Sequence, residues 1–291
     1  MMRRIVGHIR RHLPPPLRRA ARSGLLAWGW LTADLRQEPG IVVVGAQRAG
    51  TTTLFRLLSE HPALCRPTVD KGTGYFDDGY RHGRRWYRAH FPLRWTARGR
   101  VSFECSGYYL FHPLAADRIA RDLPGCQVVV MVRDPVLRAY SAHRHESARG
   151  FDALPFEEAV DREAERTRGL TELLAADPRA VSFAHRHHAY LQRGEYAAQI
   201  RRYVEALGPE RVHVVDADAL FADPVAVYLD LQRRLGLPRH RPAEVGRWNE
   251  RPGTPLRPDL AARLRRHFDR SDAALADYLG GSPSWREESL S

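Results

Sequence analysis

The chain has 291 residues, a formal net charge of +12 and an isoelectric point near 10.2. Hydrophobic residues make up 43% of it, which supplies a sizeable core and excludes global disorder. Lys and Arg total 46, and Lys71 is the single lysine, so the basic excess is partly a compositional arginine bias and argues only weakly for nucleic acid. One lysine kept among so many arginines indicates a site that needs a compact ammonium group.

The three cysteines, Cys65, Cys105 and Cys126, form no CxxC pair, which argues against a disulfide framework and favours a reducing, cytoplasmic compartment. No apolar run reaches the length of a membrane span. We divide the chain into a basic N-terminal lead-in over 1–39 and one domain over 40–291. The lead-in lacks the order of a secretory signal. Two interpretations of it stay open, namely peripheral contact with an anionic membrane and a poorly packed basic arm.

Short apolar runs predict buried parallel strands, and helical patterns lie between them. The strands are expected at 41–45, 101–104, 127–132 and 211–216. The helices are expected at 51–60, 113–122, from Pro135, at 155–168 and 184–206, from Asp218 and Pro224, and at 258–279. This alternation predicts an α/β fold with a P-loop-like parallel sheet and helices on both faces. Such sheets bind ligands beyond the carboxyl ends of their strands.

The segment GAQRAGTTT, residues 45–53, follows the first strand and opens a helix. Unpaired N–H groups at a helix start attract an anion, Gly50 lets the backbone approach it, and Arg48 adds charge. Three hydroxyls add donors, those of Thr51, Thr52 and Thr53. The spacing is close to a Walker A loop, but Thr51 stands where that loop has lysine, which argues against an NTPase. A tight turn with a threonine cap is the alternative.

The segment VVVMVRDPVLRAYS, residues 128–141, suggests a second phosphate site. Arg133 ends a buried strand, and Ser141 lies about two turns into the next helix, where it can face the same crevice. An arginine fork and a hydroxyl suit a monoester phosphate. The alternative is a surface pair of Arg133 with Asp134.

These two segments resemble the 5′-phosphosulfate loop and the 3′-phosphate motif of sulfotransferases that use 3′-phosphoadenosine 5′-phosphosulfate (PAPS). The stretches YFDDGYRHGRRWYRAHFP, FECSGYYLFHPLAADRIARDLP and YLQRGEYAAQIRRYVEALGPERVHVVDADALFADP resemble the carbohydrate (heparan sulfate-type) branch and its bacterial relatives. The resemblance covers residues 40–285. It implies PAPS as the donor and an acceptor hydroxyl on a carbohydrate or glycolipid-like metabolite. Nothing in the sequence requires a metal, and we expect none.

The resemblance also assigns residues to the donor. It implies that the 5′-phosphosulfate is held by Arg48, Gly50, Thr51 and Thr52. Arg133 and Ser141 are implied to hold the 3′-phosphate. Arg251 and Gly253 fall where the family has a late basic, glycine-containing loop over the nucleotide.

Sulfuryl transfer needs a cation at the bridging oxygen and a base for the acceptor proton. Lys71 matches the lysine of a Lys-Glu pair in the carbohydrate branch, whose Glu is the base, but Gly72 stands at the Glu position. A second lysine of eukaryotic members is Cys105 here. We expect the base to be one of three residues, in the order Glu104, His143 and Asp77. For Glu104 a structural role, in which it holds a loop by hydrogen bonds, is as well supported as the role of the base.

Three other functions stay open: a P-loop kinase or NTPase, a non-enzymatic binder of nucleic acid or membrane, and a sulfotransferase fold that binds PAPS without turnover. His185, His187 and His188 form a short cluster, but no Cys or carboxylate lies at ligand spacing, so we expect no metal there.

Overall fold

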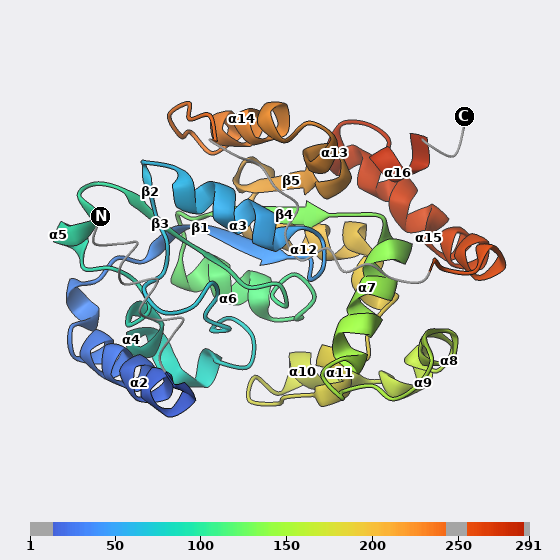
Figure 1. Ribbon diagram of the computed structural model, residues 1–291, viewed down its shortest axis with the longest axis horizontal. Coiled ribbons are helices and arrows are strands. Elements are labelled where there is room, and N and C mark those ends of the chain that lie inside the picture. The colour runs from blue at the N-terminus through green and yellow to red at the C-terminus, as the bar shows by residue number, and fades with distance from the viewer. Residues whose placement is uncertain (1–13, 243–254, 288–291) are drawn as a thin grey trace.

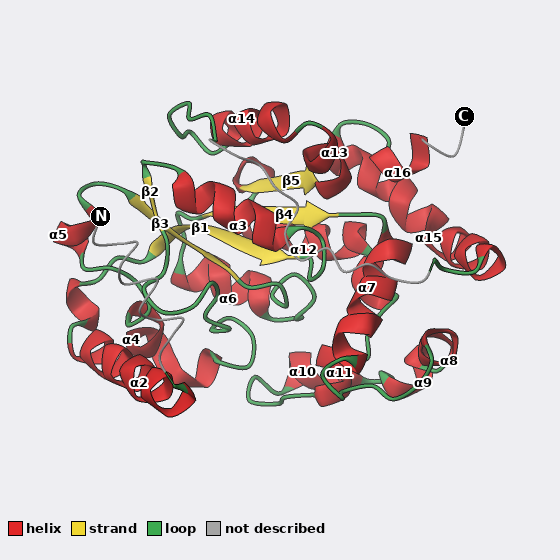
Figure 2. Cartoon of the chain, in the orientation of Figure 1, coloured by secondary structure: helices red, strands yellow, loops and turns green. Residues whose placement is uncertain are grey.

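The computed structural model describes residues 14–242 and 255–287. Five parallel strands form one sheet in the order β2-β3-β1-β4-β5, with helices on both faces (Figures 1 and 2). The strands are β1 (Pro39–Gly45), β2 (Leu64–Cys65), β3 (Val101–Cys105), β4 (Gln127–Val132) and β5 (Val212–Asp216). The predicted α/β fold with a parallel sheet is therefore confirmed.

Strand β1 lies at the centre of the sheet, where Val43 pairs with Cys105 of β3 and with Val129 of β4. Its residues 41–44 are almost completely buried because helices cover both faces, which explains the unbroken apolar run. The parallel strands bring the carboxyl ends of β1, β3 and β4 to one edge of the sheet. The segments that follow these three strands carry most of the predicted site residues.

The helices of the described residues agree with most of the expected positions. They are α2 (Pro15–Leu31), α3 (Thr51–Glu60), α4 (Gly83–Arg88), α5 (Arg94–Ala97), α6 (Ala115–Asp122), α7 (Pro135–Ser147), α8 (Phe156–Asp161), α9 (Glu163–Arg166), α10 (Leu170–Ala176), α11 (Phe183–His187), α12 (Tyr196–Leu207), α13 (Ala217–Ala222), α14 (Pro224–Arg234), α15 (Pro258–Leu279) and α16 (Ser284–Glu287). Helices α3 and α15 have the predicted bounds. The start expected at Asp218 is displaced, because the side chain of Asp216 caps α13.

The single helix expected over 184–206 is wrong, because α11 ends at His187 and α12 begins at Tyr196. The Glu163 carboxylate accepts the backbone N–H groups of Leu191 (2.6 Å) and Gln192 (2.9 Å), which satisfies these donors outside a helix. Gly194 follows, and a Cβ there would lie 2.8 Å from the Phe268 ring. Tertiary contacts therefore override the helical pattern. The expected helix over 155–168 is likewise divided, into α8 and α9, and β2 was not predicted.

The lead-in contains α2, which begins just after Pro14 and contacts α4. Arg36, further along, is buried and donates a hydrogen bond of 2.5 Å to the carbonyl of Phe91. The segment that leads into β1 is therefore packed on the domain. Among residues 14–242 and 255–287, no helix is long and apolar enough to cross a membrane.

Candidate functional site

The turn between β1 and α3 has the geometry of an anion-binding loop. Gly50 is the N-cap residue of α3 with φ 76°, and a Cβ there would lie 3.1 Å from the Phe221 ring. Arg48 also has a positive φ, 70°. Helix α3 starts at Thr51, so the N–H groups of its first turn lie at the carboxyl edge of the sheet.

Lys71 reaches this helix start from outside the loop. Its ammonium Nζ donates to the hydroxyl oxygens of Thr51 (3.0 Å) and Thr52 (3.3 Å). Its carbonyl accepts the N–H of Cys105, at 3.1 Å, which ties the segment to the end of β3. Thr53 does not join this cluster, since it is fully buried and its hydroxyl has no hydrogen-bond partner in the described part of the chain.

The second predicted motif spans the end of β4 and the start of α7. Asp134 caps α7 by accepting from the N–H groups of Val136 (2.8 Å) and Leu137 (3.1 Å). Arg133 precedes it, half-buried, with its Nε 3.7 Å from a carboxylate oxygen of Asp218. Arg133 therefore contacts Asp218 on α13, the helix that follows β5, and not its neighbour Asp134 as in the alternative.

The two predicted phosphate motifs meet through one hydrogen bond. The Nε of Arg48 donates to the hydroxyl of Ser141 at 3.0 Å. The turn between β1 and α3 thus carries two hydrogen-bonded groups, the pair of Arg48 with Ser141 and the cluster of Lys71 with Thr51 and Thr52. Arg251 and Gly253 lie outside the described residues.

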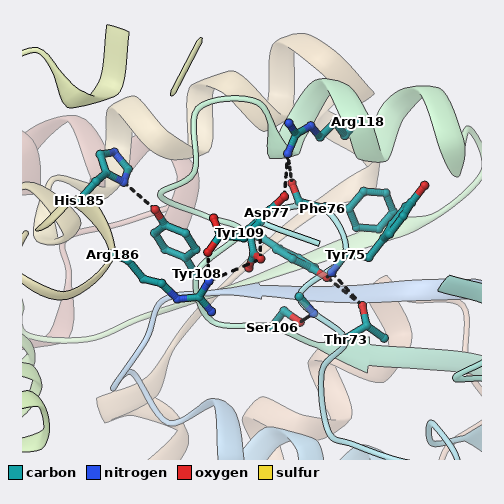
Figure 3. A network of polar contacts seen from close by, with 12 residues as sticks. Thr73, Tyr75, Phe76, Asp77, Ser106, Tyr108, Tyr109, Arg118, His185 and Arg186 are labelled. Atoms are coloured by element: carbon teal, nitrogen blue, oxygen red, sulfur yellow. Dashed lines mark hydrogen bonds and ion pairs between the residues drawn. The ribbon is translucent and has the colours of Figure 1, made fainter. Parts of the chain in front are cut away.

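Glu104 is fully enclosed and makes many hydrogen bonds. It accepts from the N–H and hydroxyl of Thr73 (2.9 and 3.1 Å) and from the hydroxyls of Tyr87 (2.8 Å) and Ser106 (3.2 Å). Burial raises the pKa of the Glu104 carboxyl. The hydroxyl of Thr73 also lies 3.1 Å from the hydroxyl of Tyr109 (Figure 3). The arrangement favours the loop-holding role over that of a base in contact with an acceptor.

His143 is also buried, within a second hydrophobic cluster. Its Nε2 lies 2.8 Å from the carbonyl of Leu154, and its ring packs 5.4 Å from both Phe156 and Tyr190. Residues two apart on a helix point in nearly opposite directions, so His143 does not share the helix face of Ser141. The structure therefore favours a packing role for this residue.

Asp77, the third expected base, is 3% exposed. Burial raises the pKa of its carboxyl to about 7, although nearby Arg186, at 3.8 Å, opposes this rise. Arg118 donates to the backbone carbonyls of Phe76 (3.0 Å) and Asp77 (2.9 Å), which fixes the turn (Figure 3). Asp77 thus combines a pKa near neutrality with a rigid position.

Gly72 has no room for a side chain. A Cβ at this position would lie 2.3 Å from the carbonyl oxygen of Cys105 and 2.4 Å from the hydroxyl of Ser106. The segment that carries Lys71 therefore lies against the end of β3, so close that only glycine fits at position 72. The carboxylate of the family's Lys-Glu pair cannot occupy position 72 of this backbone.

A partly buried chain of polar side chains beside the loop was not predicted. Gln47 donates from Nε2 to Glu146 at 3.3 Å, and Glu146 also contacts Nδ1 of His187 at 3.0 Å. Arg193 donates to the amide oxygen of Gln47. Burial acts to raise the pKa of Glu146, but the hydrogen bond and the charge of His187 outweigh it, so that this pKa is lowered. The sequence contains one indication of this chain: Gln47 lies inside the first predicted phosphate motif, and Glu146 follows the second motif on the same predicted helix as Ser141.

None of the described residues forms a group of three or more His, Cys, Asp and Glu side chains arranged to hold a metal ion. His185, from the histidine cluster, instead contacts the Tyr108 hydroxyl through Nδ1 at 2.7 Å (Figure 3).

A parallel sheet whose central strand leads through a glycine turn into a helix start defines a P-loop-like α/β protein. Within that class, the chain belongs to the sulfotransferase domain family, which residues 38–248 match. It is 29% identical over 209 residues to human bifunctional heparan sulfate N-deacetylase/N-sulfotransferase 3, covering 69% of this chain and 23% of that protein. It is 24% identical over 204 residues to mouse heparan sulfate glucosamine 3-O-sulfotransferase 5, covering 70% of this chain and 55% of that protein.

The crystal structure of a sulfotransferase from Alicyclobacillus acidocaldarius is similar, with a TM-score of 0.69 and 27% identity. That comparison covers 86% of this chain and 99% of the bacterial one. The chain spans 23% of the length of the human relative and 55% of the length of the mouse relative.

Proposed function

We propose that this protein transfers a sulfuryl group from PAPS to a hydroxyl of a carbohydrate or glycolipid-like acceptor. Membership of the sulfotransferase domain family supports the reaction class. The observation that carries the choice of donor is the hydrogen bond between Arg48 and Ser141, which joins two anion-binding motifs at neighbouring strand ends. The relatives named for heparan sulfate support a carbohydrate acceptor.

Each half of the donor has its own set of residues in this proposal. The N–H groups at the start of α3, with Arg48 and the hydroxyls of Thr51 and Thr52, hold the 5′-phosphosulfate. Arg133 and Ser141 hold the 3′-phosphate. Arg133 then exchanges its 3.7 Å contact with Asp218 for a doubly charged phosphate, which is the stronger partner.

The reaction is an in-line displacement at sulfur. The acceptor oxygen forms a bond to sulfur while the bond from sulfur to the bridging oxygen breaks, and 3′-phosphoadenosine 5′-phosphate (PAP) leaves with that electron pair. The ammonium of Lys71, positioned over Thr51 and Thr52, stabilises the negative charge that develops on the bridging oxygen. The acceptor proton passes to a base or to water.

Glu104 fits this mechanism as a positioning residue. Its carboxylate fixes Thr73, two residues after Lys71, and so holds the segment that presents the ammonium. For the base, Asp77 keeps its place among the candidates, and the pair of His187 and Glu146 joins it. A carboxylate that binds one imidazole nitrogen leaves the other to accept a proton, which is the usual arrangement of a histidine base.

Gly72 favours a second candidate function, in which the protein binds PAPS but its catalytic turnover is lost or altered. The close approach of Gly72 to Cys105 excludes the family's usual carboxylate. This alternative predicts full donor affinity without transfer to any acceptor.

Two measurements test the proposal. Calorimetry should show that PAP binds much more tightly than AMP, because AMP lacks the group that Arg133 and Ser141 hold. Equal affinities would refute the donor assignment. Incubation with radiolabelled PAPS and a panel of heparan-type oligosaccharides, glycolipids, amino sugars and phenols should then release PAP and label a hydroxyl of a carbohydrate. Tight PAP binding with no labelled product supports the inactive alternative.

A further inference from the structure

Helix α2 and the short turn after it carry an exposed apolar stripe. The side chains recur at intervals of three, four or eight residues, so they lie on one face of the helix. They are Leu17 (54% exposed), Leu25 (46%), Trp28 (56%), Leu31 (67%) and Leu35 (49%). We call this set the α2 stripe. Large apolar side chains exposed together in this way indicate an interaction surface.

Another face of α2 is fixed to the domain. Gly29 packs so closely that a Cβ there would lie 2.4 Å from the carbonyl oxygen of Ala89. The guanidinium of Arg85 lies 4.9 Å from the centre of the Trp30 ring. Figure 1 shows α2 at the edge of the molecule beside α4. The helix is therefore docked, and the α2 stripe is left exposed in this docked position.

The segment that carries most of the α2 stripe is basic, and the acidic Asp34 and Glu38 that follow it pair with arginines of α4. Residues 1–33 contain seven arginines and neither Asp nor Glu. Arg19 and Arg22 lie on α2 itself and are exposed, although Arg22 forms a surface ion pair of 2.8 Å with Asp70. An exposed apolar face beside basic side chains is complementary to a surface that is apolar inside and negatively charged outside.

We propose that α2 seats this protein on the surface of an anionic lipid bilayer. The helix lies in the interface, with the α2 stripe among the acyl chains nearest the headgroups and the arginines facing the lipid phosphates. Trp28 is suited to this depth because its ring is apolar and its N–H is polar. A second copy of the chain fits the α2 stripe less well, since it brings the same exposed arginines of α2, Arg19 and Arg22, to the contact.

Co-sedimentation of the full chain with vesicles tests this proposal. We expect binding to vesicles of equal parts phosphatidylcholine and phosphatidylglycerol, and much weaker binding to phosphatidylcholine alone. The double substitution Trp28→Ser with Leu31→Ser should weaken binding to the anionic vesicles by at least about tenfold, because two apolar side chains lose their contact with lipid. The matched control is Trp95→Ser, which changes a tryptophan that is 61% exposed on α5.

Circular dichroism and thermal unfolding should show that both variants keep the wild-type fold. The proposal is overturned if the wild-type chain does not sediment with anionic vesicles. It is also overturned if the double variant binds as well as the wild type, since arginines alone would then explain the attraction. A wild-type dimer that the double variant converts to a monomer would assign the α2 stripe to a second copy instead.

Discussion

The guanidinium Nε of Arg48 lies 3.0 Å from the hydroxyl oxygen of Ser141 and donates a hydrogen bond to it. The two residues are 93 positions apart in the chain, one in the turn after β1 and the other on α7. This bond fixes the spacing between the two proposed phosphate sites before any donor arrives. Preorganisation of this kind lowers the entropy cost of binding a ligand with two charged ends.

Arg133→Ala should remove most of the preference for PAP over AMP. An arginine–phosphate contact contributes about 1.5–3 kcal/mol, so the affinity for PAP should fall by roughly tenfold to a hundredfold while that for AMP changes little. Calorimetry with both nucleotides measures this. Arg211→Ala, at an arginine before β5, is the control; a variant that keeps the wild-type preference would contradict the assignment of Arg133.

Lys71→Arg should lower kcat strongly while PAP affinity stays near that of the wild type. The ammonium is a compact donor that contacts Thr51 and Thr52, whereas a planar guanidinium is bulkier and cannot follow the bridging oxygen in the same way. Initial rates at saturating donor, together with PAP titrations, separate the two effects. Near wild-type turnover in this variant would show that the ammonium is not needed for transfer.

Glu104→Gln should lower the free energy of unfolding by about 1–3 kcal/mol, because the amide group cannot accept all the hydrogen bonds from Thr73, Tyr87 and Ser106. Turnover should fall with it as the Lys71 segment loosens, but the pH dependence of turnover should keep its shape. Loss of the acidic limb of the pH profile, with unchanged stability, would instead identify Glu104 as the base. His143→Gln serves as a control for buried substitutions outside the site.

Asp77→Asn should change how stability depends on pH. Burial raises the folded-state pKa of Asp77 from 3.8 to about 7, so over this interval the unfolded chain loses a proton that the folded chain keeps. The wild type should therefore lose stability relative to the variant as the pH rises from about 4 to about 7. Denaturant unfolding across this range measures the difference. Asp161→Asn, at a side chain that is 50% exposed, should show no such trend.

Gly72→Ala should destabilise the protein by about 1–3 kcal/mol, the usual cost of forcing an extra group into packed surroundings. The added Cβ would meet the backbone of Cys105 at 2.3 Å. Gly72→Glu should destabilise the protein more than Gly72→Ala does, and it should not restore a catalytic base. Thermal unfolding reports both, with Gly125→Ala as the control because a Cβ there has nothing within 4 Å. A fully stable Gly72→Ala variant would show that the backbone moves easily.

Features encoded locally could be predicted from the sequence, whereas those set by distant contacts could not. The turn around Gly50 and the start of α7 at Pro135 follow from neighbouring residues, and both lie where the pattern indicated. The contact between Lys71 and Thr51 was not predicted, because it joins two segments that are 20 positions apart. The link from Gln47 to Glu146 joins residues 99 positions apart, and no periodicity in either segment indicates it.

The same limit applies to the residues expected to act as bases. Glu104 ends a strand at the right edge of the sheet, as the pattern indicated, but its surroundings come from Thr73, Tyr87 and Ser106 on other segments. His143 was placed near Ser141 by sequence distance, whereas the helix turns it toward Phe156. The local sequence pattern predicted the strand of Glu104 and the helix of His143, but it did not determine which way these side chains face.

Arg48 adopts φ 70°, a conformation that costs a residue with a Cβ roughly 1–2 kcal/mol relative to a right-handed one. Glycine would relieve this cost but would remove the guanidinium that reaches Ser141. Directed evolution should therefore favour different residues at position 48 under different selections. Selection for thermal tolerance alone should enrich glycine at position 48, whereas selection for growth that depends on the product should retain arginine, so the two populations would diverge at this residue.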